Sequence, residues 1–482
     1  MPDHTDAGVG PPQEDEIPLP RGSEIRRALG LDRDGVRMTV GSFEGRRSFV
    51  YPEVPPEGGI FRAMHVFVDV VMHVFVDVVA RSFPVVGGGR GPARRLGFGI
   101  GHGEKVTNGV DAAGAVRQLA DMTADPTMYA ARFATHGSPD VLTLDEIPIP
   151  EPGPGEVRIR VEAAALNHLD LWVRRGLPIE ITMPHIGGSD IAGTVDLVGP
   201  DVDAFVGLDG DSVAARPGER VVVDPSLAWL DPTSDPANWE GRDPAGLRLI
   251  GEHTDGGFAE YVVVPAANVV PIPDSLPFDV AAAASLAGVT AWRGLVTRGG
   301  LRDDEVVLVT GASGGVSTMA IQIAKVRGAA VIAVTSTPWV KQVEALGADL
   351  VLDRTAGDWA TVAGTARDGH GVDLALDSVG APMWKDLSRS LATGGRIVSY
   401  GATGGPKVEI DLRHHFWKQT SFLGTTMGSP EDYRAAMQAV VDGDVAPVIH
   451  ATLPLARCAE AHRMLEAGEV FGKVVLTPGS GS

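Results

Sequence analysis

The chain has 482 residues, which is enough for roughly three domains of average size. It carries 62 acidic and 41 basic residues and a formal net charge of -21, which argues against a nucleic-acid or anionic-membrane partner, because phosphate binding needs concentrated positive charge. The single cysteine, Cys458, excludes a disulfide framework and any zinc site that needs two or more thiolates.

Residues 1–127 show scattered Pro, Gly and Arg without sustained periodicity, and we interpret them as a low-order N-terminal extension. An octapeptide, MHVFVDVV, occurs at 64–71 and again unchanged at 72–79, where it could form a β-hairpin. The run is too short and too charged to span a bilayer, and no secretory signal precedes it, so we expect a cytoplasmic protein. The alternatives are a regulatory or partner-binding arm, or sequence upstream of a true start at Met128.

From Met128 onward, short alternating stretches separated by turn signals predict strands of a barrel or an irregular β domain. These stretches are Tyr129–Phe133, Glu156–Ala163, Ile191–Val198, Val221–Asp224 and Phe258–Val264. A long loop rich in Pro and Asp follows at 225–250.

After about residue 280 the pattern changes to strands that alternate with helices, which predicts a parallel sheet with helices on both faces. Helices are expected at Gly315–Arg327 and in a stretch that ends at Leu346. Strands are expected at Val306–Thr310, Val331–Val334, Val372–Leu376, Arg396–Ser399 and Ser421–Gly424.

A glycine-rich turn joins the first of these strands to the first helix. Glycine lets the backbone approach a pyrophosphate closely, and the helix N-terminus offers free N–H groups to the phosphates. We therefore predict that the turn binds a dinucleotide, the alternative being a purely structural turn. The residues are Gly311, Ala312, Ser313, Gly314, Gly315 and Val316, followed by Ser317 where a third glycine is usual.

The end of the next strand bears on which dinucleotide is bound. Thr335, Ser336 and Thr337 stand there with Lys341 nearby, and no acid follows until Glu344. Hydroxyls and a lysine suit a 2′-phosphate, whereas a carboxylate would bind the 2′-hydroxyl of NAD. We predict NADPH as the cofactor, with NADH as the alternative. Ser336 and Thr337 could instead only cap the next helix.

The segment from Met128 to the C-terminus resembles the medium-chain dehydrogenase/reductase superfamily, which includes zinc alcohol dehydrogenases, quinone oxidoreductases and enoyl reductases. The resemblance implies an α/β fold with a GroES-like β-barrel substrate domain at 128–286, completed by 425–482, and a Rossmann domain at 287–424. It also implies a homodimer formed through the strand near 421–426. The motifs that carry it are the following: Pro150–Val157, Asn167–Asp170, Gly188–Gly193, Gly218–Val221, Gly257–Tyr261, Ala287–Ala291, Gly311–Ser317 and Gly472–Val475.

By the same resemblance, the catalytic zinc ligands of the zinc-dependent branch correspond to Asn167, Ser189-Asp190 and Leu286. Asn167 and Leu286 are poor or impossible zinc ligands, and the 225–250 loop lacks the four cysteines of that branch's structural zinc lobe. We therefore expect no zinc. An improvised site would use Asp170, Asp190 and His253, although His253 could simply be a loop histidine bonded to backbone.

The resemblance places three candidate catalytic residues in the cleft. Asn167 would donate a hydrogen bond to the acceptor oxygen, and Asp170 would orient its neighbours. His168 would contact phosphate or relay a proton, the alternative being a purely structural role. Lys473 would reach a cofactor phosphate, the alternative being a solvated lysine at a strand edge. The adjacent His414 and His415 are expected to be a surface pair. Residues expected to face the nicotinamide carboxamide are Gly401, Ala402 and Thr403.

Without a Lewis acid, simple aldehydes and ketones are poor hydride acceptors, whereas quinones and α,β-unsaturated carbonyls delocalise the incoming charge. The sequence therefore predicts NAD(P)H-dependent hydride transfer to a small quinone or conjugated carbonyl. The alternatives are a zinc-binding alcohol dehydrogenase with atypical ligands and a non-catalytic NADPH-binding protein.

Overall fold

The computed structural model describes residues 38–41, 49–52, 126–227, 229 and 246–479. The chain divides into two compact units, Met1–Asn108 and Gly109–Ser482. In the first unit, β1 (Met38–Gly41) and β2 (Phe49–Pro52) pair in antiparallel fashion. The predicted hairpin at 64–79 and most of the 225–250 loop lie outside the described residues.

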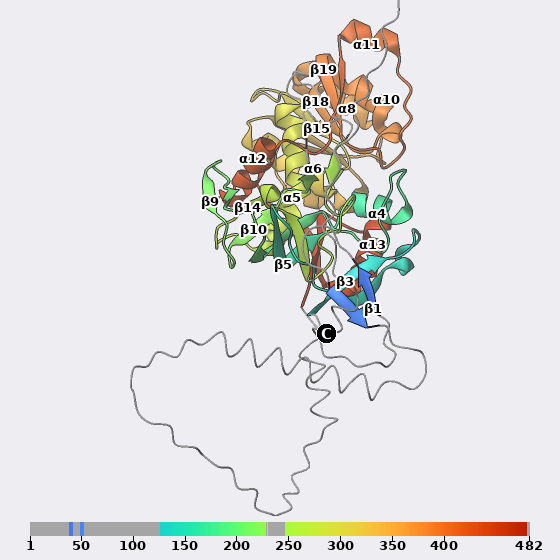
Figure 1. The fold of residues 1–482 in the computed structure, drawn as a ribbon. Coiled ribbons are helices and arrows are strands. Elements are labelled where there is room, and N and C mark those ends of the chain that lie inside the picture. The colour runs from blue at the N-terminus through green and yellow to red at the C-terminus, as the bar shows by residue number, and fades with distance from the viewer. Residues whose placement is uncertain (1–37, 42–48, 53–125, 228, 230–245, 480–482) are drawn as a thin grey trace, which may run out of the picture. The chain divides into compact units, whose positions relative to one another are not determined.

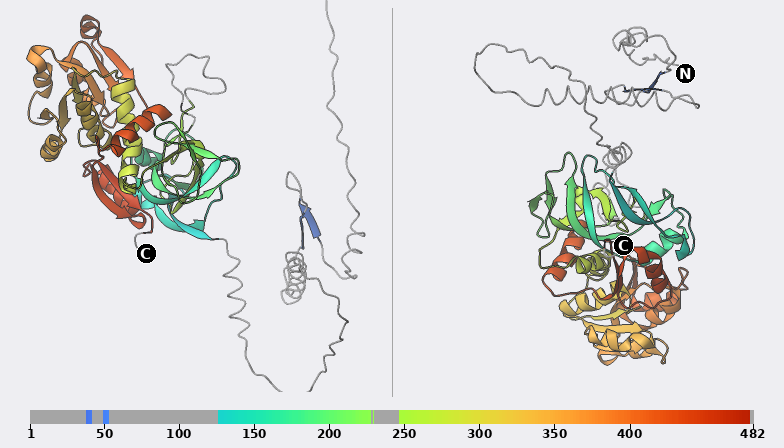
Figure 2. Two further views of the ribbon diagram at one scale, coloured as in Figure 1. Left: turned by 90° about the vertical axis from the view of Figure 1, so that its left-hand side faces the viewer. Right: turned by 90° about the horizontal axis from the view of Figure 1, so that it is seen from below.

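The second unit begins with a β domain around a seven-stranded sheet (Figures 1 and 2). Its strands run in the order β14 (Val269–Pro271), β10 (Arg220–Val223), β7 (Asp190–Val198), β5 (Glu156–Ala165), β22 (Lys473–Thr477) and β21 (Ile449–Pro454), and β13 (Tyr261–Pro265) also pairs with β5. Small sheets flank it: β3 (Thr127–Phe133) with β4 (Thr143–Pro148) and β6 (His185–Ile186), β8 (Ala204–Val206) with β9 (Ser212–Ala214), and β11 (Ser226–Leu227) with β12 (Arg248–Leu249). The return of the C-terminal strands to this domain agrees with the expectation from the sequence.

A six-stranded parallel sheet forms the other domain of this unit, in the doubly wound order expected for a Rossmann fold. The order is β17 (Leu350–Asp353), β16 (Ala330–Thr335), β15 (Val306–Val309), β18 (Val372–Asp377), β19 (Leu391–Ser399) and β20 (Ser421–Gly424). Its helices are α6 (Gly315–Val326), α7 (Val340–Ala345), α8 (Trp359–Gly364), α9 (Ala366–Gly369), α10 (Ala381–Ser390) and α11 (Leu412–Lys418). The sequence missed only one strand of this sheet, β17, because its burial is incomplete and its alternation is weak.

Successive side chains of the central strand β15 point to opposite faces of the sheet. Val307 and Val309 join the core that contains α5 and α6, and Val306 and Leu308 join the core that contains α8 and α10. All four are buried, which explains why this strand reads as a continuous apolar run and not as an alternating one.

Helix α5 (Phe278–Trp292) connects the two domains and continues into a π-helical turn at Arg293–Thr297. It packs against β5 and β7 of the β domain and against α6 and α12 (Pro430–Val441) (Figure 1). The domain boundary expected at 286/287 therefore falls inside a continuous helix. Residues 278–297 are long and apolar enough to cross a membrane, but 72% of this stretch is buried inside the protein, as in a core helix.

Candidate active site

The glycine-rich turn lies where β15 enters α6, at the carboxyl edge of the parallel sheet. Gly311 has a φ of +53°, which favours glycine, and a Cβ there would lie 3.4 Å from the Ser378 hydroxyl of the neighbouring strand end. Gly315 is the first residue of α6, and the first N–H groups of a helix have no partner within it. The turn thus has the geometry of a phosphate-binding site.

Side-chain hydrogen bonds hold this turn in place. The Ser317 hydroxyl donates to the Thr310 carbonyl at 2.9 Å and lies 3.0 Å from the Tyr400 hydroxyl. The Thr310 hydroxyl donates to Asp377 at 2.6 Å, and burial raises the pKa of that carboxyl group. Ser317 therefore stands where a third glycine is usual, and its small side chain has hydrogen-bond partners on both neighbouring segments.

The loop at 401–403, which is predicted to contact the nicotinamide, lies beside the glycine-rich turn. The Thr403 amide donates to the Ser378 carbonyl at 3.0 Å, and a Cβ on Gly401 would lie 3.3 Å from the same oxygen. Since Ser378 also borders Gly311, the structure brings Gly401, Ala402 and Thr403 to the edge of the sheet that holds the glycine-rich turn.

The predicted 2′-phosphate region lies at the ends of β16 and β17. Ser336 is half-buried, Lys341 is exposed, and the Thr337 hydroxyl lies 3.2 Å from that of Thr355. The amide of Arg354 donates to the Thr335 carbonyl at 2.9 Å, so this exposed arginine stands beside the same strand end.

A carboxylate also lies at this strand end. Asp353 accepts from the Thr355 amide at 2.8 Å and from the Thr355 hydroxyl at 2.7 Å, and hydrogen bonds from Thr337 and Thr355 lower its pKa. The sequence pattern did not bring Asp353 or Arg354 into the site, because their position depends on the parallel pairing of β17 with β16.

The centre of the candidate active site is a buried cluster of Lys473, Asn167 and Asp190. The Lys473 ammonium donates to the Asn167 side-chain oxygen at 2.6 Å, to Asp190 Oδ2 at 2.8 Å and to the Leu166 carbonyl at 2.6 Å. The Asn167 Nδ2 donates to Asp190 Oδ2 at 2.9 Å, and the Leu286 amide donates to Asp190 Oδ1 at 2.7 Å. Lys473 is 4% exposed and Asp190 is fully buried.

This geometry differs from the role predicted for Lys473. An ammonium group has three hydrogens, and the three acceptors above use all of them, so the structure places Lys473 in a buried ion pair. The lysine nevertheless touches the glycine-rich turn. The Gly472 amide donates to the Ser313 carbonyl at 2.8 Å, and a Cβ on Gly315 would lie 2.6 Å from Lys473 Cδ.

Asp170 and His168 lie at the start of α4 (His168–Arg175), next to the cluster. Asp170 accepts from the Asn167 amide at 2.7 Å and from the Gly188 amide at 3.0 Å, so it holds two backbone segments together. Burial raises its pKa to about 7. The His168 ring remains accessible to solvent, yet desolvation by the protein around it lowers its pKa, and the charges of Lys473 and Arg175 act in the same direction.

At the positions that the resemblance gives for the catalytic zinc ligands, only Asp190 has a side chain that commonly binds zinc, and it is paired with Lys473. Leu286 has no donor atom, the Asn167 amide is bound to Lys473 and Asp190, and the buried Ser189 hydroxyl has no partner among the described residues. In the part of the chain that the structure describes, no three His, Cys, Asp or Glu residues are grouped as a metal site requires. His253 accepts from the Leu249 amide at 3.1 Å, as expected for a loop histidine.

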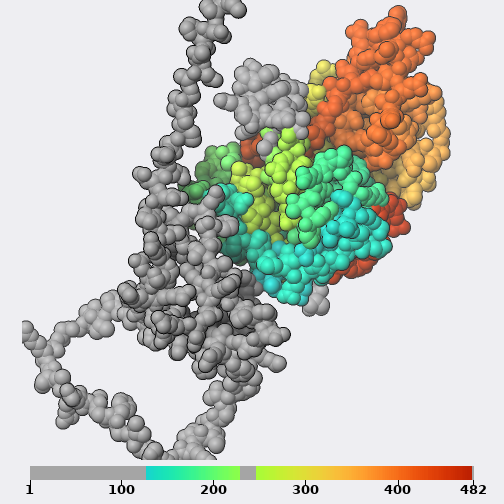
Figure 3. All heavy atoms as spheres, turned by 45° about the vertical axis from the view of Figure 1, so that its right-hand side comes forward, coloured from blue at the N-terminus to red at the C-terminus, as the bar shows by residue number. Residues whose placement is uncertain are grey.

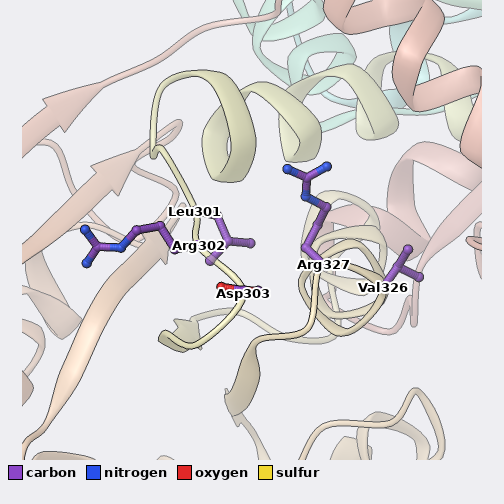
Figure 4. A pocket seen from close by; sticks show the side chains of 5 residues that line it. All are labelled: Leu301, Arg302, Asp303, Val326 and Arg327. Carbon is purple, nitrogen blue, oxygen red and sulfur yellow. The ribbon is translucent and has the colours of Figure 1, made fainter.

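Two other features lie apart from this cluster. His415 stacks on Phe422 with ring centroids 4.6 Å apart and bonds to Thr420, so it is engaged separately from His414. An open hollow of about 500 Å³ (Figure 4) lies near the amino-terminal end of β15, whereas the glycine-rich turn follows the carboxyl-terminal end of that strand. Its lining residues precede β15 or end α6: Leu301, Arg302, Asp303, Val326 and Arg327.

Comparisons with known proteins agree with this architecture. Family models match an alcohol dehydrogenase GroES-like domain at residues 153–274 and a zinc-binding dehydrogenase domain at 315–442. The acryloyl-coenzyme A reductase of Sulfurisphaera tokodaii is 30% identical over 338 residues, which cover 70% of this chain and 96% of the relative. The quinone oxidoreductase of Homo sapiens is 29% identical over 365 residues, covering 73% and 99%. A crystal structure of an NAD-dependent alcohol dehydrogenase is 40% identical, with a TM-score of 0.66 and coverage of 73% and 99%.

Proposed function

The chain belongs to the medium-chain dehydrogenase/reductase superfamily, and we propose that within it the protein transfers a hydride from NADPH to a quinone or an α,β-unsaturated carbonyl without a catalytic zinc. Its place among nicotinamide-dependent oxidoreductases rests on the matched family models and the relatives. The choice of acceptor rests on the cluster of Lys473, Asn167 and Asp190, which supplies hydrogen-bond donors where a metal-dependent relative needs metal ligands.

The chemistry follows from what these donors can stabilise. The reduced nicotinamide ring supplies a hydride when the cofactor is bound, so the acceptor takes up two electrons with one hydrogen and then a separate proton. A neutral amide stabilises negative charge less than a divalent cation does, so the charge must be spread over a conjugated acceptor. In this proposal the Asn167 amide binds the acceptor oxygen, and His168 or solvent delivers the proton.

The preference for NADPH rests on the charges at the ends of β16 and β17. Lys341 and Arg354 are exposed there, and both suit a 2′-phosphate. Asp353 is the residue that favours NADH, because both bonds from Thr355 reach its Oδ1 and Oδ2 could bind a ribose hydroxyl, but the two cations outnumber this one carboxylate. We therefore propose NADPH as the better substrate and NADH as the weaker one.

A second candidate is oxidation or reduction of a simple alcohol–aldehyde pair. The 40% identity to an NAD-dependent alcohol dehydrogenase structure and the match to a zinc-binding dehydrogenase model favour it. It requires a source of charge stabilisation that the side chains at the cluster do not offer.

The test uses the full chain and measures NADPH and NADH oxidation with quinones, enals and saturated aldehydes, together with cofactor reduction by alcohols. Metal content is determined on the same preparation. We expect turnover with quinones or conjugated carbonyls that a chelator does not affect. Activity confined to alcohols and aldehydes, with about one zinc per chain whose removal abolishes turnover, would contradict the proposal. Tight NADPH binding without oxidation by any acceptor would instead favour a non-catalytic NADPH-binding protein.

A further inference from the structure

The buried cluster constrains the Asn167 amide in a way that the sequence does not reveal. Lys473 can only donate hydrogen bonds and the ionised Asp190 can only accept them. The Asn167 oxygen must therefore face the Lys473 ammonium, and its nitrogen must face the Asp190 carboxylate, as the distances of 2.6 Å and 2.9 Å show. The amide therefore has one orientation. Rotating it by 180° would place its NH₂ group against the ammonium, where both are donors, and its oxygen against the carboxylate, where both are acceptors.

This orientation leaves one hydrogen of the amide unused. The Asn167 nitrogen carries two hydrogens and donates one to Asp190, and no described residue accepts the other. Asn167 is 9% exposed as a whole residue, and the remaining hydrogen is the group of this side chain that an acceptor oxygen would bind. The Lys473 ammonium on the amide oxygen also polarises the group, which makes the remaining N–H a stronger donor.

The same lysine connects the Asn167 amide to the glycine-rich turn. Its side chain crosses the first residue of α6, where Gly315 leaves room for it, and the preceding Gly472 is bonded to the Ser313 carbonyl. The donor for the acceptor and the predicted phosphate-binding turn are thus held together by two consecutive residues from the returning C-terminal strand.

We propose that Lys473 and Asp190 are positioning residues that orient and polarise Asn167, so that its free amide N–H binds the oxygen of the hydride acceptor. The proposal rests on the proposed function, because it assumes that an acceptor with a carbonyl or quinone oxygen enters the cleft. It assigns Lys473 to the acceptor side of the reaction, through Asn167, and not to the cofactor phosphates.

The test is a double-mutant cycle in the full chain with Asn167→Ala, Lys473→Met and the double variant. We expect Asn167→Ala to lower kcat with a quinone roughly 100-fold and Lys473→Met to lower it about 10-fold or more. In the Asn167→Ala background the lysine substitution should change kcat less than about 2-fold, because a residue that acts through Asn167 has nothing left to position. The Kd for NADPH, measured by fluorescence, should change less than about 3-fold in all variants.

Two controls keep the result interpretable. Lys325→Met breaks an exposed Lys–Asp pair of the same 2.8 Å length and should leave kcat unchanged. Because Lys473→Met leaves Asp190 buried without its partner, the variant Lys473→Met/Asp190→Asn removes both charges, and it should fold and still show the kcat defect.

Two outcomes overturn the proposal. Additive effects of the two substitutions would show that Lys473 acts independently of Asn167, and a loss confined to NADPH affinity would assign the lysine to the cofactor. If the wild type reduces a different acceptor, the proposed function fails, and the same cycle measured with that acceptor still tests the role of Lys473. If no acceptor is turned over, calorimetric affinity of the NADP⁺ complex for a quinone replaces kcat, and equal affinity in wild type and Lys473→Met contradicts the proposal.

Discussion

Gly315 belongs to the glycine-rich turn and also contacts Lys473 of the buried cluster. A methyl group there would lie 2.6 Å from Lys473 Cδ, and the lysine cannot yield because three acceptors hold its ammonium. We expect Gly315→Ala to lower kcat/KM for NADPH by roughly 10- to 100-fold, because the first turn of α6 and the cluster cannot both keep their positions. Steady-state kinetics at varied NADPH measures this.

The matched control for this glycine is Gly364→Ala at the end of α8. A Cβ at Gly364 would lie 3.6 Å from its nearest neighbour, which is an ordinary van der Waals contact, and its φ is not positive. Equal kinetics for Gly315→Ala and the wild type would show that the turn and the lysine are less tightly packed than the structure indicates.

Cofactor selectivity is also decided by single residues. We expect Arg354→Ala and Lys341→Ala each to reduce the preference for NADPH over NADH by about 10-fold, because each removes a charge-assisted contact to a 2′-phosphate. The ratio of kcat/KM values for the two cofactors is the measurement. Arg327→Ala, which removes an exposed arginine at the hollow in Figure 4, serves as control. An unchanged ratio in both test variants would place the 2′-phosphate elsewhere.

At the scale of elements, the end of β10 carries an unusual buried carboxyl group. Asp224 accepts from the Ser226 amide at 3.0 Å, and burial raises its pKa from 3.8 to about 7. The folded state thus binds this proton more tightly than the unfolded state does. The free energy of unfolding should fall as the pH rises from about 4 to about 7, by roughly 4 kcal/mol for this group at most.

Asp224→Asn removes this titration and keeps an oxygen for the Ser226 amide, so it should flatten the dependence of stability on pH. Urea denaturation at pH 5 and pH 7.5 measures the difference. Asp170 has a pKa raised in the same direction, so part of the slope should remain. Asp274→Asn, which alters a fully exposed side chain, should not change the slope. Identical slopes for Asp224→Asn and the wild type would contradict the prediction.

For the whole molecule, the outer edge of the parallel sheet suggests how two chains would meet. Strand β20 ends the sheet, and α11 beside it exposes Leu412, Phe416 and Trp417 at 66%, 64% and 81%. The orange region that contains α11 forms the outer end of the described part in Figure 3. An unpaired strand edge next to exposed apolar side chains is typical of a surface that another chain covers.

We therefore expect a homodimer, as the resemblance implied, and expect Phe416→Ser/Trp417→Ser to shift it toward monomer. Sedimentation velocity at micromolar concentration measures the change. Val326→Ser alters an exposed apolar residue at the end of α6 and should leave the oligomeric state unchanged. A wild-type protein that sediments as a monomer would contradict the expectation.

The sequence by itself determined the features that depend on local pattern. The apolar run of β15, the glycine-rich turn and α6 follow one another within about twenty residues, so turn chemistry and periodicity were enough to predict a dinucleotide-binding turn in a parallel sheet with helices on both faces. The same holds for five strands of the β domain, which are β3, β5, β7, β10 and β13; in β5 the alternating side chains match the alternating burial.

The tertiary structure decided everything that joins distant segments. Lys473 reaches Asn167 across 306 positions of the chain, and Arg354 comes beside Thr335 only because β17 pairs with β16. The predicted domain boundary divides α5, since a helix buried against both domains carries no composition signal for where one ends. Local propensity fixes elements, whereas the partner of a buried charge is fixed only by the packing of strands that are remote in sequence.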